Sequence, residues 1–517
     1  MRIHELHIKR YKNLKDFEIR FDEKEAISVL LGRNGSAKSN LIEALVEIFA
    51  QLESKKPPSF RYKLSYTCRS KDIFIDAGYT DANLNGATTT DGSLSYNQFL
   101  EGNYLPSHVF VYYSGTSDRL SKFFIPAMDS YRSDLHREQD RPLRRMFFTR
   151  GDHSSLILFC FLADDEPWSM RFLKRRFGIE KIHSARIHLR ESEHSKGLKR
   201  EAKVGEDRFW RTSGRVACAL RALHTAGIPL RNTVRKKDGD ELEDLFVFYP
   251  DAESLLALRE RYQRKKDLFH ALDDLFVDGF LKSIRFRLKI EGEDEPIEFS
   301  ELSEGEQQLI SVIGFLRFTK DQDSLFLLDE PDTHLNPLWG MEYQEMLSDA
   351  MSGEKTSQII MATHDPMVIS GMTRKSVRVM RKNKSGTHTM IEAPPPDEDP
   401  QGMGIGRILT SDMFGLRSIL DNKTQAVLDK KRELLAKSEL TEKDLAKLDE
   451  YNEKLRGIDV TLLATDPLYP LFVKTLVSDP DYERVEKILD DYERREEQFT
   501  LAKSAAAKLI QKLKHLG

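Results

Sequence analysis

The chain has few cysteines, no long apolar run and little net charge, and each of these absences excludes a class of protein. Its 517 residues include three scattered cysteines, Cys68, Cys160 and Cys218. They fit neither a disulfide framework nor a zinc site, which predicts a reducing, cytoplasmic location. No apolar stretch approaches the roughly 20 residues of a membrane helix, and the first residues lack the apolar core of a secretory signal. We expect two to four domains and no membrane contact.

The small net charge of −4 hides a basic segment. Residues 171–237 contain 19 Lys or Arg and 6 Asp or Glu, a balance of +13, so the rest of the chain carries −17. A segregated basic segment favours contact with a polyanion, DNA or RNA. The alternative is a solvated face, or a basic surface that docks on the acidic remainder of the chain.

A glycine-rich turn near the N-terminus has the chemistry of a phosphate-binding loop. Alternating residues predict strands at 3–8 and 17–21, a strand at 26–31 leads into Gly32–Ser39, and a helix is expected from Ser39 to about residue 52. Such a loop points backbone N–H groups and a helix N-terminus at phosphate. Lys38 supplies an ammonium for the β/γ-phosphates and Ser39 a hydroxyl for Mg²⁺. One departure is Ala37, where the usual residue is glycine, and its methyl is expected to crowd the phosphate.

Two later strands end in residues that suit a metal ion and a reacting water. The apolar run 325–328 is followed directly by Asp329 and Glu330. A fully apolar strand is buried on both faces, where two carboxylates are costly without a metal or water to serve. Asp332 follows in the next turn. The strand at 358–362 runs into His364, which is placed to sense or polarise the γ-phosphate.

A third motif precedes a helix between these two regions. Ser303, Gly305 and Glu306 form a Ser-x-Gly-Glu turn ahead of a helix with an apolar face. Such a turn presents a hydroxyl, a close backbone and a positive dipole end to an anion. The same residues also fit an ordinary capping box.

These four motifs, in this order, resemble the ATP-binding cassette (ABC) family. The resemblance implies an ATPase whose sites form between two head-to-tail copies, with the Ser-x-Gly-Glu turn contacting ATP held by the partner copy. It implies Glu330 and His364 as catalytic residues and Mg²⁺ held by Ser39 and Asp329. The nucleotide contacts that it implies are Gly32, Arg33, Asn34, Gly35, Ser36, Ala37, Lys38, Ser39, Asn40, Ser303, Gly305, Glu306 and Asp332. The family's glutamine loop is not placed: the matching strand ends at Tyr112-Tyr113-Ser114, and Gln98 is a weak candidate.

The short hairpin that leads into Gly-Arg-Asn-Gly-Ser is similar to the chromosome-maintenance (SMC), RecF and OLD branch of the family. About 260 residues separate the first motif from the third, too few for long coiled-coil arms, and no nuclease pattern is visible. Residues 111–115, 411–416 and 466–469 resemble the PtuA-type ATPases of Septu and some retron anti-phage systems. That resemblance implies a homo-oligomer controlling a separately encoded nuclease, commonly of the HNH kind. The PARIS ATPase is a competitor of the same class. A RecF-like repair ATPase is the alternative, and a transporter cassette is a remote one.

The expected fold class is α/β, an ABC-type head with a phosphate loop on a mixed or parallel sheet. We expect an N-terminal lobe at 1–115, a helix-rich insertion at 116–275 that contains the basic segment, and a second lobe at 276–392. A proline-rich linker at 393–402 is expected to lead to a helical oligomerisation or partner region at 405–517. In its final helix, apolar residues fall three or four apart from Leu501 to Leu516.

Overall fold

The computed structural model describes residues 1–455, apart from 55, 79–86, 90–91, 95–97, 100–101, 103, 116, 118, 136–143, 150–152, 164–166, 193–208, 211, 236–240, 263–264, 320–321, 386–387 and 436–440. The chain divides into two compact units, Met1–Arg417 and Ser418–Gly517. The predictions for residues 466–469 and for the apolar stripe of the final helix lie outside the described residues. Among those described, no helix is both long and apolar enough to span a bilayer.

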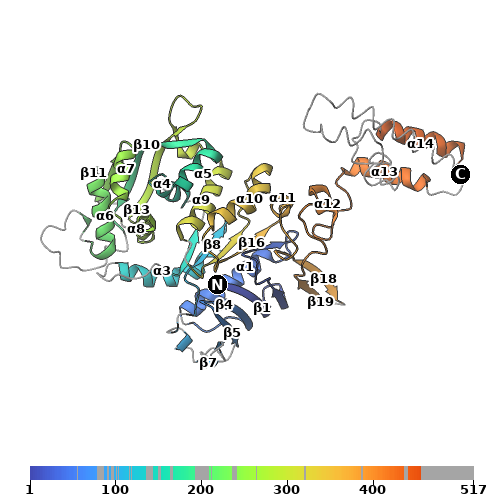
Figure 1. Ribbon diagram of the computed structural model, residues 1–517, viewed down its shortest axis with the longest axis horizontal. Coiled ribbons are helices and arrows are strands. Elements are labelled where there is room, and N and C mark those ends of the chain that lie inside the picture. The colour runs from blue at the N-terminus through green and yellow to red at the C-terminus, as the bar shows by residue number, and fades with distance from the viewer. Residues whose placement is uncertain are drawn as a thin grey trace. The chain divides into compact units, whose positions relative to one another are not determined.

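A six-stranded parallel sheet forms the centre of the first unit (Figure 1). Adjacent residues of β15 point to opposite faces: Leu325 and Leu327 belong to one apolar core, and Phe326 and Leu328 to the other. The expected burial on both faces is therefore confirmed. The strands, in spatial order, are β17 (Val377–Val379), β3 (Ile27–Leu31), β16 (Gln358–Thr363), β15 (Leu325–Asp329), β8 (Val109–Tyr113) and β9 (Met146–Thr149).

One face of this sheet is covered by α1 (Lys38–Glu53) and a second, antiparallel sheet. The hairpin of β1 and β2 begins that sheet, with Glu5 opposite Arg20 and Tyr11 opposite Leu14. Inward positions of β1 such as Leu6 and Ile8 are fully buried, which fits the alternation in the sequence. The strands are β2 (Leu14–Arg20), β1 (Arg2–Tyr11), β4 (Tyr62–Cys68), β5 (Lys71–Ala77), β6 (Ala87–Thr89) and β7 (Gly92–Leu94).

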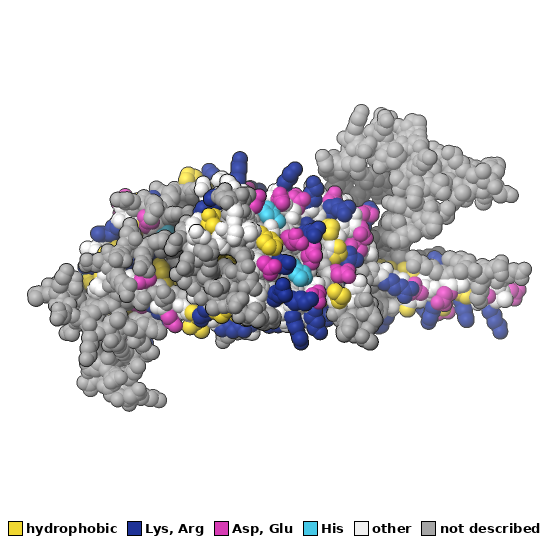
Figure 2. Space-filling view, turned by 90° about the horizontal axis from the view of Figure 1, so that it is seen from below, with side chains coloured by type: hydrophobic (Ala, Val, Ile, Leu, Met, Phe, Trp, Pro, Cys, Tyr) yellow, Lys and Arg dark blue, Asp and Glu magenta, His cyan; other side chains and the backbone are white. Residues whose placement is uncertain are grey.

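The outer face of the antiparallel sheet is an ordinary solvated surface. Figure 2 shows Lys and Arg side chains interspersed there with Asp and Glu. Several are paired across the strands, as in Lys9–Asp16 at 2.6 Å and Lys63–Asp76 at 3.3 Å. Exposed pairs of this kind contribute about 0–1 kcal/mol each, so they neutralise part of the charge on this face and add little stability.

The other face of the parallel sheet packs against helices and a third sheet. Gly314 of α9 lets that helix approach α4, because a Cβ there would lie 1.9 Å from a methyl of Ile157. The helices are α4 (Ser154–Ala163), α5 (Pro167–Phe177), α6 (Gly214–Ala226), α7 (Ala252–Arg259), α8 (Lys265–Val277), α9 (Glu304–Thr319), α10 (Pro337–Ala350) and α11 (Pro366–Ile369). The helix α3 (Ser121–Leu135) contacts both α1 on the first face and α8 on this one.

Residues 116–275 hold more β-structure than the expected helix-rich insertion. They contribute β10 (Ile179–Arg190), β11 (Ile228–Arg235) and β12 (Glu241–Tyr249) to a five-stranded sheet with β13 (Leu281–Ile290) and β14 (Ile297–Glu298). In β10, Ile187 and Leu189 are buried between polar neighbours, a period of two. The many Lys and Arg residues at the alternate positions obscured that period in the sequence.

The proline-rich segment 393–402 is part of the first unit rather than a free linker. Val379 donates a backbone hydrogen bond of 2.8 Å to Pro394, and Gln401 donates one of 2.9 Å to Met372. The segment follows the hairpin of β18 (Arg381–Ser385) and β19 (His388–Glu392) and precedes α12 (Ile405–Thr410). The division between the units therefore falls at 417/418, later than the composition indicated.

The second unit, as far as it is described, contains α13 (Asn422–Leu435) and α14 (Glu442–Leu455), which pack against each other. Leu428 and Leu448 are its buried apolar side chains among the described residues. Thr441 and Asp444 exchange hydrogen bonds and cap the start of α14.

Candidate nucleotide site

The phosphate loop joins the carboxyl end of β3 to α1. Lys38 folds back into the loop, where its ammonium donates a 2.7 Å hydrogen bond to the Gly32 carbonyl. A Cβ at Gly32 would lie 2.6 Å from the backbone oxygen of Met380, so the loop has no room for a side chain there. Burial lowers the pKa of the Lys38 ammonium, and nearby carboxylates oppose that shift. The loop thus holds a buried cation that an added phosphate would stabilise.

Ala37 adopts a left-handed conformation, with φ 77° and ψ 15°. Glycine takes this conformation without penalty, whereas another L-residue is strained by about 1–2 kcal/mol. The sequence predicted crowding by the Ala37 methyl, and the backbone supplies a second reason why glycine suits this position. Beside it, the Ser36 hydroxyl is buried with no hydrogen-bond partner among the described residues.

The two acids predicted at the end of β15 lie beside the phosphate loop. Asp329, 1% exposed, accepts a 3.0 Å hydrogen bond from the Ser39 hydroxyl. Burial raises the pKa of Asp329 to about 6, although the bond from Ser39 acts in the opposite direction. Burial makes the ionised Asp329 carboxylate unfavourable without a cation. Together with the adjacent Ser39 hydroxyl it forms a suitable pair of ligands for Mg²⁺.

Glu330 and His364 meet at the ends of the neighbouring strands β15 and β16. Nδ1 of His364 lies 3.3 Å from Oε1 of Glu330. Glu330 has a φ of 51°, a left-handed conformation rare for a non-glycine residue. Its backbone is held by the N–H bond to Ala362 at 2.9 Å and by the Thr333 hydroxyl, which donates to the Glu330 carbonyl at 2.8 Å. Strain retained by surrounding contacts is common at functional sites.

Asp332 lies just behind this pair and is also buried. It accepts a hydrogen bond from the Thr363 hydroxyl, and its second oxygen, Oδ1, has no partner among the described residues. Burial raises the pKa of Asp332 to about 6. A buried carboxylate oxygen without a partner is costly, so Asp332 suits a position where a water or ligand completes its bonds.

These features fit Mg²⁺-ATP. The loop is tightly packed at Gly32, and Lys38 and the unpartnered Ser36 hydroxyl supply donors for phosphate oxygens. Ser39 and Asp329 supply adjacent oxygens for the metal ion. A triphosphate and its metal ion would add the counter-charges that this cluster of Lys38 and carboxylates lacks.

The Ser-x-Gly-Glu turn is a capping box in this chain. The Ser303 hydroxyl donates to Glu306 at 2.8 Å, and the Glu306 N–H donates back to that hydroxyl at 3.3 Å. A Cβ at Gly305 would lie 2.3 Å from the carbonyl oxygen of His334, so this glycine is required by the loop after β15. Among the described residues, these contacts join the turn to its own chain's 331–336 loop rather than to the phosphate loop.

Several residues that the sequence did not single out connect these motifs. Gln308 of α9 hydrogen-bonds the Tyr112 hydroxyl and donates to the Glu330 carbonyl at 3.4 Å, so it connects the helix after the Ser-x-Gly-Glu turn with the end of β15. Ser114 follows the carboxyl end of β8, where its N–H donates to Asp329 and its hydroxyl lies 3.4 Å from that of Thr333. Ser114 therefore lies at the carboxyl end of β8, where the resemblance to the ABC family predicts the glutamine loop. Gln98 precedes the opposite end of β8.

Two of the predicted nucleotide contacts are engaged elsewhere in the chain. Asn40 lies between Asn13 and Arg119, with hydrogen bonds of 2.6 and 2.7 Å. Arg33 donates to the carbonyl oxygens of Phe414 and Gly415 at 2.9 and 3.1 Å. The second of these contacts joins the phosphate loop to the end of the first unit, a connection for which the sequence carried no signal.

Several of the described cations of the basic segment are paired within the chain. Arg190 binds Asp244 at 2.6 Å, and its hydrogen bond holds the pKa of that carboxyl low. Arg215 pairs with the buried Asp274 at 2.7 Å. These pairs favour the view that part of the segment docks on acidic residues of its own chain. They leave fewer cations for a polyanion than the composition indicated.

Comparisons with known proteins agree with this site. A family model described as "AAA ATPase domain" matches residues 1–200, and one described as "AAA domain, putative AbiEii toxin, Type IV TA system" matches residues 178–370. The first range contains the phosphate loop, and the second contains the signature turn, the acids and His364. The two matches confirm the prediction of an ATPase.

Two curated relatives are both Septu protein PtuA. The one from Bacillus mycoides is 24% identical over 165 residues, 31% of this chain and 22% of the relative. The one from Bacillus thuringiensis is 25% identical over 185 residues, 33% of this chain and 46% of the relative. The chain thus spans less than half the length of either. Among solved structures, the SMC head domain from Thermotoga maritima aligns with 76% of this chain and 98% of its own at 12% identity, with a TM-score of 0.30.

Proposed function

We propose that this chain, an ATPase with an ABC-type head, binds Mg²⁺-ATP at sites completed by a second copy and uses them to control a separately encoded nuclease in anti-phage defence. The observation that carries the nucleotide part is the convergence of Lys38, Ser39, Asp329, Glu330 and His364 at one edge of the parallel sheet. The defence part is supported by the similarity to Septu protein PtuA.

In the proposed reaction, each residue has a role that its surroundings favour. Lys38 binds the β/γ-phosphates, and Ser39 and Asp329 would hold a Mg²⁺ ion, which when bound would supply positive charge beside the phosphate oxygens. The Glu330 carboxylate accepts a hydrogen bond from the attacking water and orients it. His364, bonded to Glu330, fixes that carboxylate and contacts the γ-phosphate.

The second copy is proposed because the signature turn contacts its own 331–336 loop. Ser303, Gly305 and Glu306 would present their N–H groups and hydroxyl to ATP on the partner's phosphate loop. Gly305 packs against His334, and Gln308 reaches Glu330. Binding of the partner's ATP to this turn would therefore affect the position of Glu330 and of the 331–336 loop in the same chain. Two sites would thereby be coupled across one dimer.

A mixing experiment tests the shared site. Lys38→Ala and Ser303→Arg each remove one half of it, so each variant alone should lack ATPase activity. In an equal mixture, half of the dimers combine the two variants, and each of these has one intact site. About a quarter of the wild-type activity should return if the two sites act independently. No recovery, with heterodimers demonstrated by two affinity tags, would place the whole site in one chain.

The catalytic role of Glu330 and the partner have their own tests. Glu330→Gln should lower hydrolysis by about 100-fold or more while the variant keeps ATP and remains dimeric. Glu345→Gln, on the exposed side of α10, is the matched control and should hydrolyse ATP normally.

Affinity purification of the full chain with its genomic neighbours tests the defence role. A nuclease in the eluate supports it, whereas DNA without a nuclease would favour the RecF-like repair alternative.

A further inference from the structure

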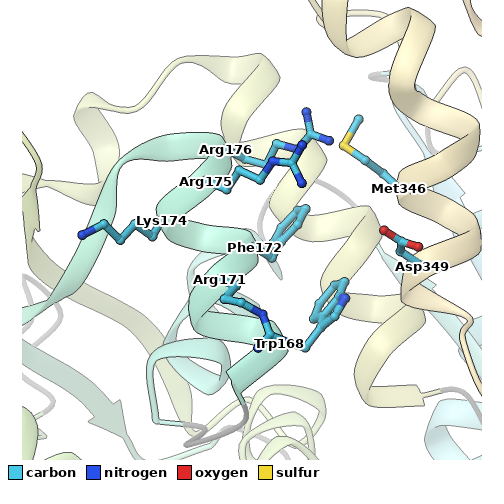
Figure 3. Close-up of a pocket in the computed structure, with 8 residues that line it drawn as sticks. All are labelled: Trp168, Arg171, Phe172, Lys174, Arg175, Arg176, Met346 and Asp349. Atoms are coloured by element: carbon cyan, nitrogen blue, oxygen red, sulfur yellow. The ribbon is translucent and has the colours of Figure 1, made fainter.

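A hollow of about 430 Å³ lies between α5 and α10, away from the residues of the ATP site (Figure 3). Its volume is in the range of small-ligand sites. Figure 3 shows Arg175 and Arg176 extending from α5 toward α10, with Phe172 and Trp168 between the two helices, while Lys174 points to the opposite side. The hollow therefore has positively charged side chains at its rim and aromatic side chains at its floor.

Two of its cations have no partner within the described part of the chain. Arg176 is committed to an ion pair with Glu342 of α10, and Lys174 lies 3.4 Å from Glu180. Arg171 and Arg175 are exposed and make neither an ion pair nor a hydrogen bond to another described residue. The two residues lie one helical turn apart on α5, where Figure 3 shows Arg175 beside Arg176 and Arg171 extending toward Trp168. A guanidinium group suits phosphate, which it can bind in a bidentate manner.

The floor of the hollow is apolar and rigid. Trp168 and Phe172 stack with ring centroids 5.2 Å apart and planes 3° from parallel, and the Arg317 guanidinium lies 4.8 Å from the Trp168 ring centroid. Met346 of α10 completes this surface. Both faces of Trp168 are thus occupied, so a ligand would meet ring edges and the methionine side chain. A flat, partly apolar group fits such a floor.

Asp349 is the one acidic residue among those that line the hollow. It is exposed at the end of α10, and no side-chain partner holds its carboxylate among the described residues. Asp349 would repel a bare polyphosphate or an acidic peptide. It would instead accept hydrogen bonds from a ligand that carries N–H donors beside its phosphate. Guanine has two adjacent donors on its Watson–Crick edge, which match the two oxygens of a carboxylate.

We propose that this hollow binds a guanine nucleotide, with phosphate on Arg171 and Arg175 and the base edge on Asp349. The nucleotide is either free or part of a single strand, because both present the same chemistry. The site is separate from the ATP site, yet α10 begins at Pro337, directly after the loop that holds Asp332. A ligand here is therefore placed to change ATP turnover, and this last step rests on the proposed function.

Binding is tested on the wild-type full chain with the ATP site filled by a non-hydrolysable ATP analogue. The probes are GMP, AMP, and an eight-nucleotide strand with one guanine against the same strand with adenine there. We expect GMP, the guanine strand or both to bind saturably, at least threefold more tightly than the adenine probe. Saturation by GMP identifies a free nucleotide, and binding by the strand alone identifies a nucleic acid. No saturable binding at low salt, or competition by polyglutamate with equal effect, overturns the proposal.

Two sets of variants locate the site. Arg171→Glu with Arg175→Glu should weaken binding at least tenfold, and the milder Arg171→Gln with Arg175→Gln keeps the test valid if charge reversal harms folding. The matched control, Lys15→Glu with Lys24→Glu, changes net charge equally at exposed cations of the other lobe and should have no effect. Asp349→Asn should abolish the preference for guanine while ATP-analogue binding is unchanged. Retained guanine preference in that variant, or unaltered binding in both Arg pairs, contradicts the assignment.

Discussion

Replacing Ala37 with glycine should make the phosphate loop more stable and a better nucleotide binder. Ala37 holds φ 77° in the loop, a left-handed conformation that strains an L-residue, and its side chain is buried in the apolar core around α1. The strain amounts to about 1–2 kcal/mol for an L-residue. Glycine gives back about 0.5–1 kcal/mol of this through its greater freedom in the unfolded chain. The net gain in the free energy of unfolding is therefore about 1 kcal/mol or less.

The effect on ATP affinity is separate from that on stability. If the methyl also crowds the phosphate, Ala37→Gly removes a repulsion that exists only in the complex. An improvement of about 1.4 kcal/mol would appear as tenfold tighter binding, measured by calorimetric titration of Mg²⁺-ATP into the Glu330→Gln background to prevent turnover. The unfolding gain is small for a chain of this length, so it should appear as a rise of about 1–2 °C in the melting temperature.

A control at another left-handed residue separates the two effects. Ser70, with φ 59°, lies in the turn between β4 and β5, remote from the phosphate loop. Ser70→Gly should raise the melting temperature similarly and leave ATP affinity unchanged. If Ala37→Gly changes stability but not affinity, the methyl does not crowd phosphate. If it changes neither, the conformation assigned to Ala37 is wrong and the reasoning from strain fails.

Three further changes test other parts of the head. Asp329→Asn should stabilise the nucleotide-free protein at pH 7.5 by on the order of 1–3 kcal/mol. The pKa of Asp329 is about 6 in the folded state and 3.8 in the unfolded state, so the ionised carboxylate destabilises the folded protein. This destabilisation is absent below pH 4, grows between pH 4 and 6, and is complete above pH 6. Thermal melts across that range check this, and Mg²⁺-dependent ATP binding should weaken below pH 6 in the parent alone. Gly305→Ala should lose hydrolysis but keep ATP binding, because its Cβ would clash with the His334 carbonyl; Gly371→Ala, where the methyl would meet a flexible Gln344 side chain, is the control in an ATPase assay. A chain ending at Arg417 should bind ATP and lose the higher oligomer and partner on light scattering and pull-down, and one that keeps both contradicts a docking role for the second unit.

The motifs that the sequence singles out lie together at one edge of the sheet because each is local and sits at the end of a strand or the start of a helix. Asp329 and His364 are 35 positions apart, yet β15 and β16 are parallel neighbours, so their carboxyl ends must meet. The same reasoning places the phosphate loop, since β3 pairs with β16. The resemblance of these motifs to the ABC family implied the ABC-type head and the ATPase activity.

The parts that the sequence did not predict depend on contacts between distant segments. The left-handed backbone at Glu330 could not be predicted, because a glutamate, unlike a glycine, does not indicate that conformation. The strands of residues 179–249 were missed because their outward positions carry charge. Arg190 and Arg215 counted as free cations in the composition, although Asp244 and Asp274 neutralise them in the fold. Composition measures charge along the chain, whereas a binding surface depends on the charge left over after folding.

The contact between Arg33 and residues 414–415 determines how the second unit can be studied. Arg33 belongs to the phosphate loop, and its guanidinium binds the carbonyls of Phe414 and Gly415, three and two residues before the boundary at Arg417. Gly415 has φ 61°, and a Cβ there would lie 3.3 Å from the Arg33 guanidinium, so the backbone turns tightly around this side chain. A chain cut after Gly402 would lose these acceptors and the buried Ile408 and Met413 as well. Its loss of ATP binding would then reflect a damaged phosphate loop, which is why the informative truncation ends at Arg417.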